Sequence, residues 1–251
     1  MNAAALSTRP LPSKRDEAFR YSNIETLASA WPIAEETVTV TKDSSHSLDI
    51  INTAPAGDVF VRHIQLTLES GARSAIHVLN AGGRLGRIVL DVTLHDSADF
   101  ALNVVQLGSG TQTVEIITTV THKQPNATSN QQVRTILSGQ ATGSYLGKVA
   151  VARDAQKSDS VQSVKAMLLD RTATANAKPE LEIYADDVKC AHGATVGELD
   201  KEAMFYLAAR GLPPAEAKKL LLQAFIASVF DGVDNEAVLI KAALAKLEEM
   251  V

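Results

Sequence analysis

Hydrophobic and polar residues alternate through the middle of the chain, from about Thr37 to Gly197. The alternation is clear in Thr37–Thr41 and in Val59–Leu68. Each run ends in turn-forming residues, such as Glu69–Ala72, which contains Gly71. Period-two alternation bounded by such turns is typical of β-strands. The pattern therefore predicts a body made mainly of short strands.

The apolar positions of one strand-turn-strand unit recur 24 residues later, with a slip of two residues in the turn. The first unit has Ile64, Leu66, Leu68, Ala72, Ile76 and Val78, and the second has Ile88, Leu90, Val92, Ala98, Leu102 and Val104. A unit this short cannot bury its own apolar face, so neighbouring units have to stack, as in a β-solenoid. A β-sandwich also contains many short alternating strands, and the repeat only favours the solenoid over it.

Helical periodicity appears on both sides of the strand-rich body. In Ser13–Ser29, apolar residues recur at helical intervals and predict a short helix that ends at Trp31-Pro32. Near the other end, Asp200 is placed to cap a helix over Lys201–Arg210, which Gly211 stops. We therefore expect an N-terminal helical segment (1–36), a β-solenoid core (37–197) and a C-terminal helical domain (198–251).

Two further helices are predicted in the C-terminal domain. Pro213-Pro214 opens the first, which Asp231-Gly232 ends, and Asp234 is placed to cap the second over Glu236–Glu249. The earlier of the two is apolar over more than half of its circumference, with LLLQAFIASVF at its centre. Such a surface is either the core of a small helical cap or a docking surface for another subunit, and both can hold at once.

Composition narrows the classes of function. The net charge of -5 and the scattered lysines and arginines argue against nucleic acid as a partner. No signal-peptide core and no apolar run of about 20 residues is found, so we expect a cytoplasmic protein without a membrane segment. Cys190 is the only cysteine, which excludes an intrachain disulfide and a multi-cysteine metal cage built by this chain alone.

Cys190 and His192 are the residues best suited to metal chemistry. On an extended strand, positions i and i+2 point to the same side. A thiolate and an imidazole there can bind iron or zinc. They are only two ligands, so a complete site needs donors from a second chain. The alternative is structural, because a lone cysteine is often a small core residue and a lone histidine is often a hydrogen-bonded structural group.

The run ELEIYADDVKCAHGATVGELDKEAMFYLAARGLPPAEAKKLLLQAFI resembles the C-terminal signature of the SufB/SufD family, and SufD more than SufB. The run LPSKRDEAFRYSNIETLA is similar to the N-terminal helical segment of SufD proteins. The resemblance implies a mainly β fold, with a right-handed β-helix core flanked by N- and C-terminal helices. Family members typically have a longer central solenoid, which leaves the number of coils open.

The resemblance implies a scaffold subunit of the SUF iron-sulfur cluster assembly complex, and not an enzyme. Such a subunit pairs with a SufB-like subunit through the β-helices, and its C-terminal helices bind a SufC-like ABC ATPase. Cys190 and His192 match the family's Cys-x-His near that interface, so a transient cluster or iron shared with SufB is expected, with none held tightly by this chain alone. A homodimer of the isolated chain stays open. The expected docking residues are Leu220, Leu221, Phe225, Met204 and Leu207.

Other classes of function fit the sequence less well. A carbohydrate-active β-helix enzyme needs clustered carboxylates, but Asp186 and Asp187 are adjacent and would face opposite ways on a strand. A nucleotide-binding enzyme needs a phosphate loop, and Ala81–Gly86 lacks its Lys-Ser/Thr. A stand-alone structural interaction protein remains the other alternative.

Overall fold

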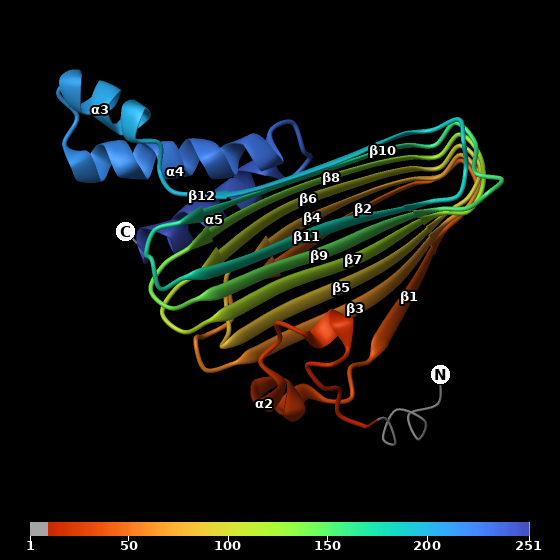
Figure 1. The fold of residues 1–251 in the computed structure, drawn as a ribbon, viewed down its shortest axis with the longest axis horizontal. Helices are drawn as coiled ribbons and strands as arrows, with labels where there is room; N and C mark the ends of the chain where they lie inside the picture. Colours follow the sequence, from red (N-terminus) through yellow and green to blue (C-terminus); the bar gives the residue numbers. More distant parts are fainter. Residues whose placement is uncertain (1–9, 251) are drawn as a thin grey trace.

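Two stacks of parallel strands run the length of the molecule in the computed structural model, which describes residues 10–250 (Figure 1). The first nine residues of the predicted N-terminal segment, and Val251, lie outside the described residues. Every strand pair within the two sheets is parallel. The sheets of a β-sandwich are antiparallel, so the parallel pairing confirms the solenoid prediction and excludes the sandwich.

Each coil of the solenoid gives one strand to each six-stranded sheet. The odd-numbered sheet contains β1 (Glu35–Val40), β3 (Val59–Leu68), β5 (Leu85–Leu94), β7 (Thr113–His122), β9 (Thr142–Val151) and β11 (Thr174–Ile183). The even-numbered sheet contains β2 (Ser45–Asn52), β4 (Arg73–Asn80), β6 (Asp99–Gly108), β8 (Thr128–Leu137), β10 (Asp159–Leu168) and β12 (Lys189–Gly197). Strand order follows chain order in both sheets, so β11 and β12 form the last coil.

The repeat differs from the predicted 24 residues. Ile64 pairs with Leu90, and Ile76 pairs with Leu102, so both halves of this coil repeat at 26 residues and there is no slip in the turn. Later coils are longer, and Thr142 pairs with Thr174. The prediction of 24 was wrong because the apolar alternation fits equally well after a shift of two residues, and only backbone pairing fixes the register.

The solenoid core lies between the two sheets and is built mainly from Ile, Leu and Val. Inward positions such as Leu66, Val92 and Val104 are fully buried, and outward neighbours on the same strands are more exposed. Burying such a side chain stabilises the fold by about 1.5 to 3 kcal/mol. The stacked aliphatic rows therefore hold the coils together.

The N-terminal segment is broken into short pieces and not formed as the single helix predicted over Ser13–Ser29. It contains η1 (Glu17–Phe19), α2 (Ile24–Leu27) and η2 (Ala28–Ala30). The break occurs because the side chain of Asn23 accepts a hydrogen bond from the Thr26 amide and starts a new helix there. The segment ends before Trp31, as predicted.

Three helices follow the last strand: α3 (Lys201–Ala209), α4 (Pro214–Phe230) and α5 (Glu236–Glu248). Helices α4 and α5 pack on the outer face of the even-numbered sheet, and α3 packs on α4 and projects past the sheets (Figure 1). Leu222, Ile226 and Phe230 fill this second core together with outward residues of the sheet. None of the described helices is long and apolar enough to cross a membrane.

The predicted ends of the C-terminal helices agree with the structure except for one cap. Asp200 caps α3 by accepting from the Glu202 and Ala203 amides, and Gly211 has a positive φ of 91° just after the helix. Helix α5 begins at Glu236 as predicted, but the cap predicted at Asp234 is wrong, because Asn235 occupies the N-cap position. Asn235 makes no side-chain cap and bonds Asp49 on β2 instead.

Candidate functional site

Cys190 and His192 lie on β12, the last strand of the even-numbered sheet. They pair in register with Ser160 and Gln162 of β10, whose side chains are buried between the sheets. In-register residues of parallel strands point to the same face, and Cys190 packs against the inner core. Both side chains therefore sit on the inner side of the last coil, and they share a face as the i, i+2 spacing predicted.

No described element covers the last coil, so the solenoid is open at this end (Figure 1). The change in exposure between the last two even-numbered strands is abrupt. Ala166 of β10 is buried, and its in-register neighbour Val196 on β12 is 49% exposed. His192 is also exposed, although it continues an inward-facing row. The inner core thus ends in an open surface that displays an imidazole and a half-buried thiol.

The thiol of Cys190 is protonated under ordinary conditions. Burial is the main cause that raises its pKa, Asp159 raises it further, and a hydrogen bond with the backbone of Ser160 acts in the opposite direction. A thiol becomes a metal ligand by losing its proton. Cys190 therefore depends on a bound metal or a cationic neighbour to become one.

The open end supplies too few donors for a metal site of its own. Within residues 10–250, no group of three or more His, Cys, Asp or Glu side chains is arranged to hold a metal ion. Cys190 and His192 are two donors on one strand. Tetrahedral iron and zinc sites in proteins use three or four.

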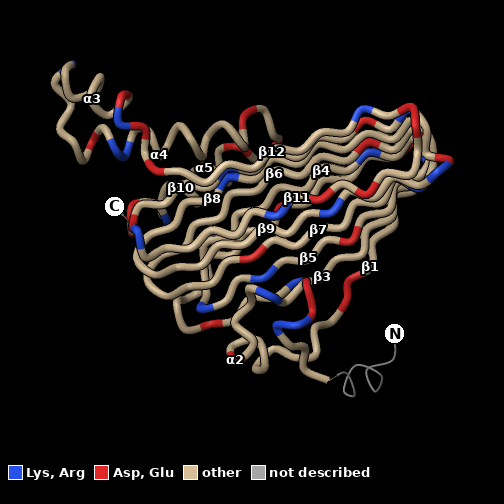
Figure 2. The backbone as a smooth tube through the Cα atoms, viewed as in Figure 1, with Lys and Arg blue, Asp and Glu red and all other residues tan. Residues whose placement is uncertain are grey.

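The two strands at the open end differ in how their free edges are protected. Strand β11 carries Pro179 between charged residues, and proline or charge on an edge strand discourages pairing with another chain. Strand β12 has no charged residue after Lys189 (Figure 2). Its free edge is therefore long, neutral and available for backbone hydrogen bonds to a further strand.

Two strongly exposed aromatic side chains of the C-terminal helices are not among the predicted docking residues. Phe205 is 77% exposed and Tyr206 is 56% exposed, both on α3. The predicted docking face of α3 contains Met204 and Leu207, and both of these are half-buried. The signal in the sequence is that α3 has apolar residues on more than one side. Only one side can pack on α4, so the other side stays exposed.

The other predicted docking residues lie on α4 in different surroundings. Leu220 is exposed and Leu221 is half-buried. Phe225 packs against the second core, between the helices and the outer face of the even-numbered sheet, with the guanidinium of Arg134 5.9 Å from the centre of its ring. Phe225 therefore helps to hold α4 on the solenoid.

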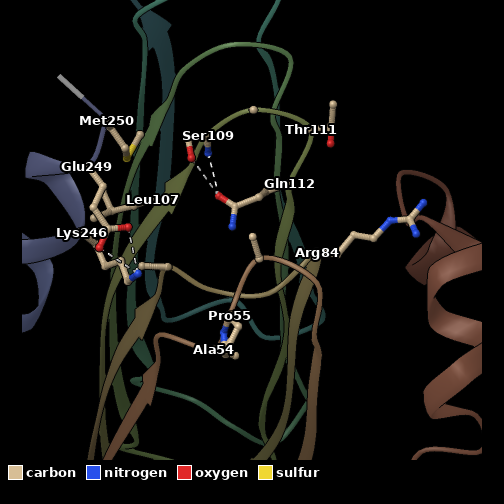
Figure 3. A pocket seen from close by; sticks show the side chains of 13 residues that line it. Ala54, Pro55, Arg84, Leu107, Ser109, Thr111, Gln112, Lys246, Glu249 and Met250 are labelled. Carbon is tan, nitrogen blue, oxygen red and sulfur yellow. Dashed lines mark hydrogen bonds and ion pairs between the residues drawn. The ribbon is translucent and has the colours of Figure 1, made fainter.

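The structure also places two other regions that the sequence brought into question. Asp186 and Asp187 are exposed in the bend between β11 and β12, and not on a strand as assumed for the carboxylate argument. A pocket of about 390 Å³ lies between the loops around Arg84 and the end of α5 (Figure 3). Its Lys246 and Glu249 form an ion pair with each other.

Comparison with known proteins gives a consistent family. The family model described as "SUF system FeS cluster assembly, SufBD core domain" matches residues 24–225. An iron-sulfur cluster assembly SufBD family protein of Synechocystis is 34% identical over 73% of this chain and 41% of its own length. SufD of Escherichia coli is 31% identical over 69% of this chain and 41% of its own length.

A chloroplastic protein of Arabidopsis thaliana, ABCI7, is 28% identical over 90% of this chain and 46% of its own length. The chain thus spans less than half the length of these relatives. The family match covers the whole solenoid and part of each flanking helical region. The chain belongs to the SufB/SufD family of SUF iron-sulfur cluster assembly proteins, and is most similar to SufD.

Proposed function

We propose that this protein is a SufD-like scaffold subunit, without enzymatic activity of its own, which helps to assemble nascent iron-sulfur clusters beside a SufB-like subunit. The observation that carries the proposal is the open end of the solenoid, where His192 and Cys190 lie on the inner side of the uncovered last coil. Iron and sulfide are the cargo at this end and are not resident cofactors of the chain.

The free edge of β12 is the proposed contact with the SufB-like subunit. An exposed neutral edge of nine residues can continue the sheet into a partner strand, while Pro179 and the charges of β11 restrict pairing on the other sheet. Pairing there would cover Val196 and bring donors from the partner next to His192. The cluster ligands would then come from both chains, with His192 as the principal donor of this chain.

Helix α3 is the proposed docking element for a SufC-like ATPase. Phe205 and Tyr206 of α3 and Leu220 of α4 are exposed apolar side chains, and α3 projects past the sheets (Figure 1). Met204, Leu207 and Leu221 are half-buried on the same two helices. Together these residues make the proposed docking surface. Only Glu198–Asp200 separate α3 from β12, so movement of the ATPase subunits would be transmitted directly to the strand that carries His192.

The test of the site is cluster reconstitution in the co-purified complex carrying His192→Ala. We expect the iron and sulfide content to fall to a small fraction of the wild-type value. The matched control is His95→Ala, since His95 lies in the turn after β5 and its side chain bonds Gln124. Unchanged iron and sulfide in the His192 variant, with the complex intact, would refute the ligand role.

The docking surface is tested separately. We expect the double variant Phe205→Ser and Tyr206→Ser to lose co-purification of the ATPase while keeping the SufB-like subunit. Val238→Ser is the control, because Val238 is exposed on α5 and outside the proposed surface. Retention of the ATPase by the double variant would count against α3 as the docking element.

A further inference from the structure

One inward row of the solenoid changes from apolar to polar toward the open end. Its in-register residues are Leu48, Ile76, Leu102, Gln131, Gln162 and finally His192. Burying an amide costs free energy unless it is hydrogen-bonded. Two buried glutamines in a row that would otherwise hold leucine or isoleucine therefore call for an explanation beyond packing.

A buried hydrogen-bond network holds these glutamines in place, and we call it the polar seam: Thr118, Gln131, Tyr145 and Gln162. The carbonyl oxygen of Gln131 accepts from the hydroxyls of Thr118 and Tyr145, at 3.0 and 3.1 Å. Gln162 Nε2 donates to the Tyr145 hydroxyl at 3.0 Å and to the Gly147 carbonyl at 3.1 Å. Burial raises the pKa of Tyr145 to about 12, so its hydroxyl keeps its proton.

The backbone leaves room for this network at one glycine. A Cβ atom on Gly147 would lie 2.1 Å from the Tyr145 hydroxyl, so only glycine allows the ring to lie there. The Gly147 carbonyl can only accept a hydrogen bond, and this fixes which way the amide of Gln162 faces. Nε2 must point to β9, and Oε1 is left as the free atom.

Gln162 Oε1 has no hydrogen-bond partner among the described residues, although its side chain is only 1% exposed. Its two neighbours along the row are Gln131 and His192. Adjacent strands lie about 4.8 Å apart, which brings in-register side chains into contact. Gln131 Nε2 also has no partner, and a carbonyl oxygen has two lone pairs, so Oε1 can accept from both neighbours.

We propose that Gln162 is a positioning residue for His192: a turn of the exposed His192 ring brings the N-H of one ring nitrogen to the unpartnered Oε1 and leaves the other nitrogen facing the open end as a donor. This inference rests on the proposed function of His192. A ligating histidine typically gives its second N-H to a fixed acceptor, which sets the tautomer and the ring orientation. The polar seam supplies that acceptor from inside the solenoid.

The test is the ring tautomer of His192, measured by NMR on the full chain with ¹⁵N-labelled histidine and assigned with His192→Ala. In the wild type we expect one dominant tautomer, with the two ring nitrogen resonances far apart. In Gln162→Met, which has no acceptor at that position, the two resonances should move toward each other. Tyr145→Phe removes one anchor of the Gln162 amide and should give a smaller change in the same direction.

Gln106 provides a matched control. It is a buried glutamine whose Nε2 also bonds a hydroxyl and a backbone carbonyl and whose Oε1 also lacks a partner, but its row ends at Val196. Gln106→Met should leave the His192 resonances unchanged. Unchanged resonances in both Gln162→Met and Tyr145→Phe, or an equal change in Gln106→Met, would overturn the proposal.

Reconstitution in the complex gives a second measurement. Loss of a group that orients a ligand typically costs 10- to 100-fold in metal affinity or activity, so we expect cluster assembly to slow by about tenfold in Gln162→Met. The ligand role of His192 and the positioning role of Gln162 can be refuted independently. Normal cluster assembly in His192→Ala would refute the ligand role. The tautomer of the His192 ring tests the positioning role without any cluster.

Discussion

Replacing Arg87 by methionine tests how the N-terminal segment is fixed to the solenoid. Arg87 and Glu115 form an ion pair with 2.6 Å between Nη1 and Oε2, and each side chain is only 1% exposed. Nη1 also donates to the Ser22 hydroxyl and Nη2 to the Ala18 carbonyl, both at 2.8 Å. The guanidinium lies 4.2 Å from the centre of the Phe19 ring. One buried cation thus joins two strands to the segment that precedes them.

The expected loss of stability in Arg87→Met comes from the Glu115 carboxylate, which remains buried without its partner. Removing one partner of a buried pair costs about 3 to 5 kcal/mol, because the other charge stays buried and unpaired. Glu115→Leu in the same chain removes that charge, so the double variant should recover most of the loss. Arg62→Met is the control, because Arg62 and Glu36 are also 2.6 Å apart but lie at the surface, where a pair contributes about 1 kcal/mol or less.

The assay is urea unfolding at neutral pH, followed by circular dichroism and by the fluorescence of Trp31, the only tryptophan. Trp31 packs edge-on against Phe19 with the ring centres 6.0 Å apart, so its emission reports whether the segment is attached. A loss below about 1 kcal/mol in Arg87→Met, or a double variant as unstable as the single one, would refute the reasoning.

Two further predictions concern the solenoid interior. Burial holds the pKa of His122 down to about 4, against about 6.5 in an unfolded chain, so the unfolded state takes up a proton first as the pH falls. The stability of the wild type should therefore fall by about 3 kcal/mol between pH 7 and pH 4 relative to His122→Gln, and parallel curves of unfolding free energy against pH would contradict this. Gly147→Ala should destabilise the fold by about 1 to 3 kcal/mol in urea unfolding, because its Cβ would meet the Tyr145 ring. Gly57→Ala, where nothing lies within 4 Å, should be near neutral, and equal losses in the two variants would be the contrary result.

The sequence predicted the class of fold because alternation and turn residues are local signals. It could not fix the register, since a shift of two residues leaves the same side chains facing inward, as the pairing of Ile64 with Leu90 shows. Helical periodicity predicted one N-terminal helix. The segment is broken instead, because the side chain of Asn23 caps a new helix within it. These errors arise where backbone hydrogen bonds, and not hydrophobicity, decide the outcome.

The candidate site was only partly predictable. The spacing of Cys190 and His192 placed them on one face, but their position on an uncovered last coil depends on the whole stack of strands. Gln162 is polar at a position where the alternation calls for an apolar residue, and its burial follows from the register with Gln131. Phe205 was missed because helical periodicity identifies the face that packs and not the face that stays exposed.

Hydrogen exchange along β12 tests most directly whether the open end is a shared interface. The amides of β12 that point away from β10 are at the sheet edge in the single chain. We expect their exchange to slow by at least about tenfold when the SufB-like subunit is bound, while the opposite edge strand β2 serves as the internal reference. If β12 exchanges at the same rate in the chain alone and in the assembled complex, the open end does not close on a partner, and the shared site at His192 is contradicted.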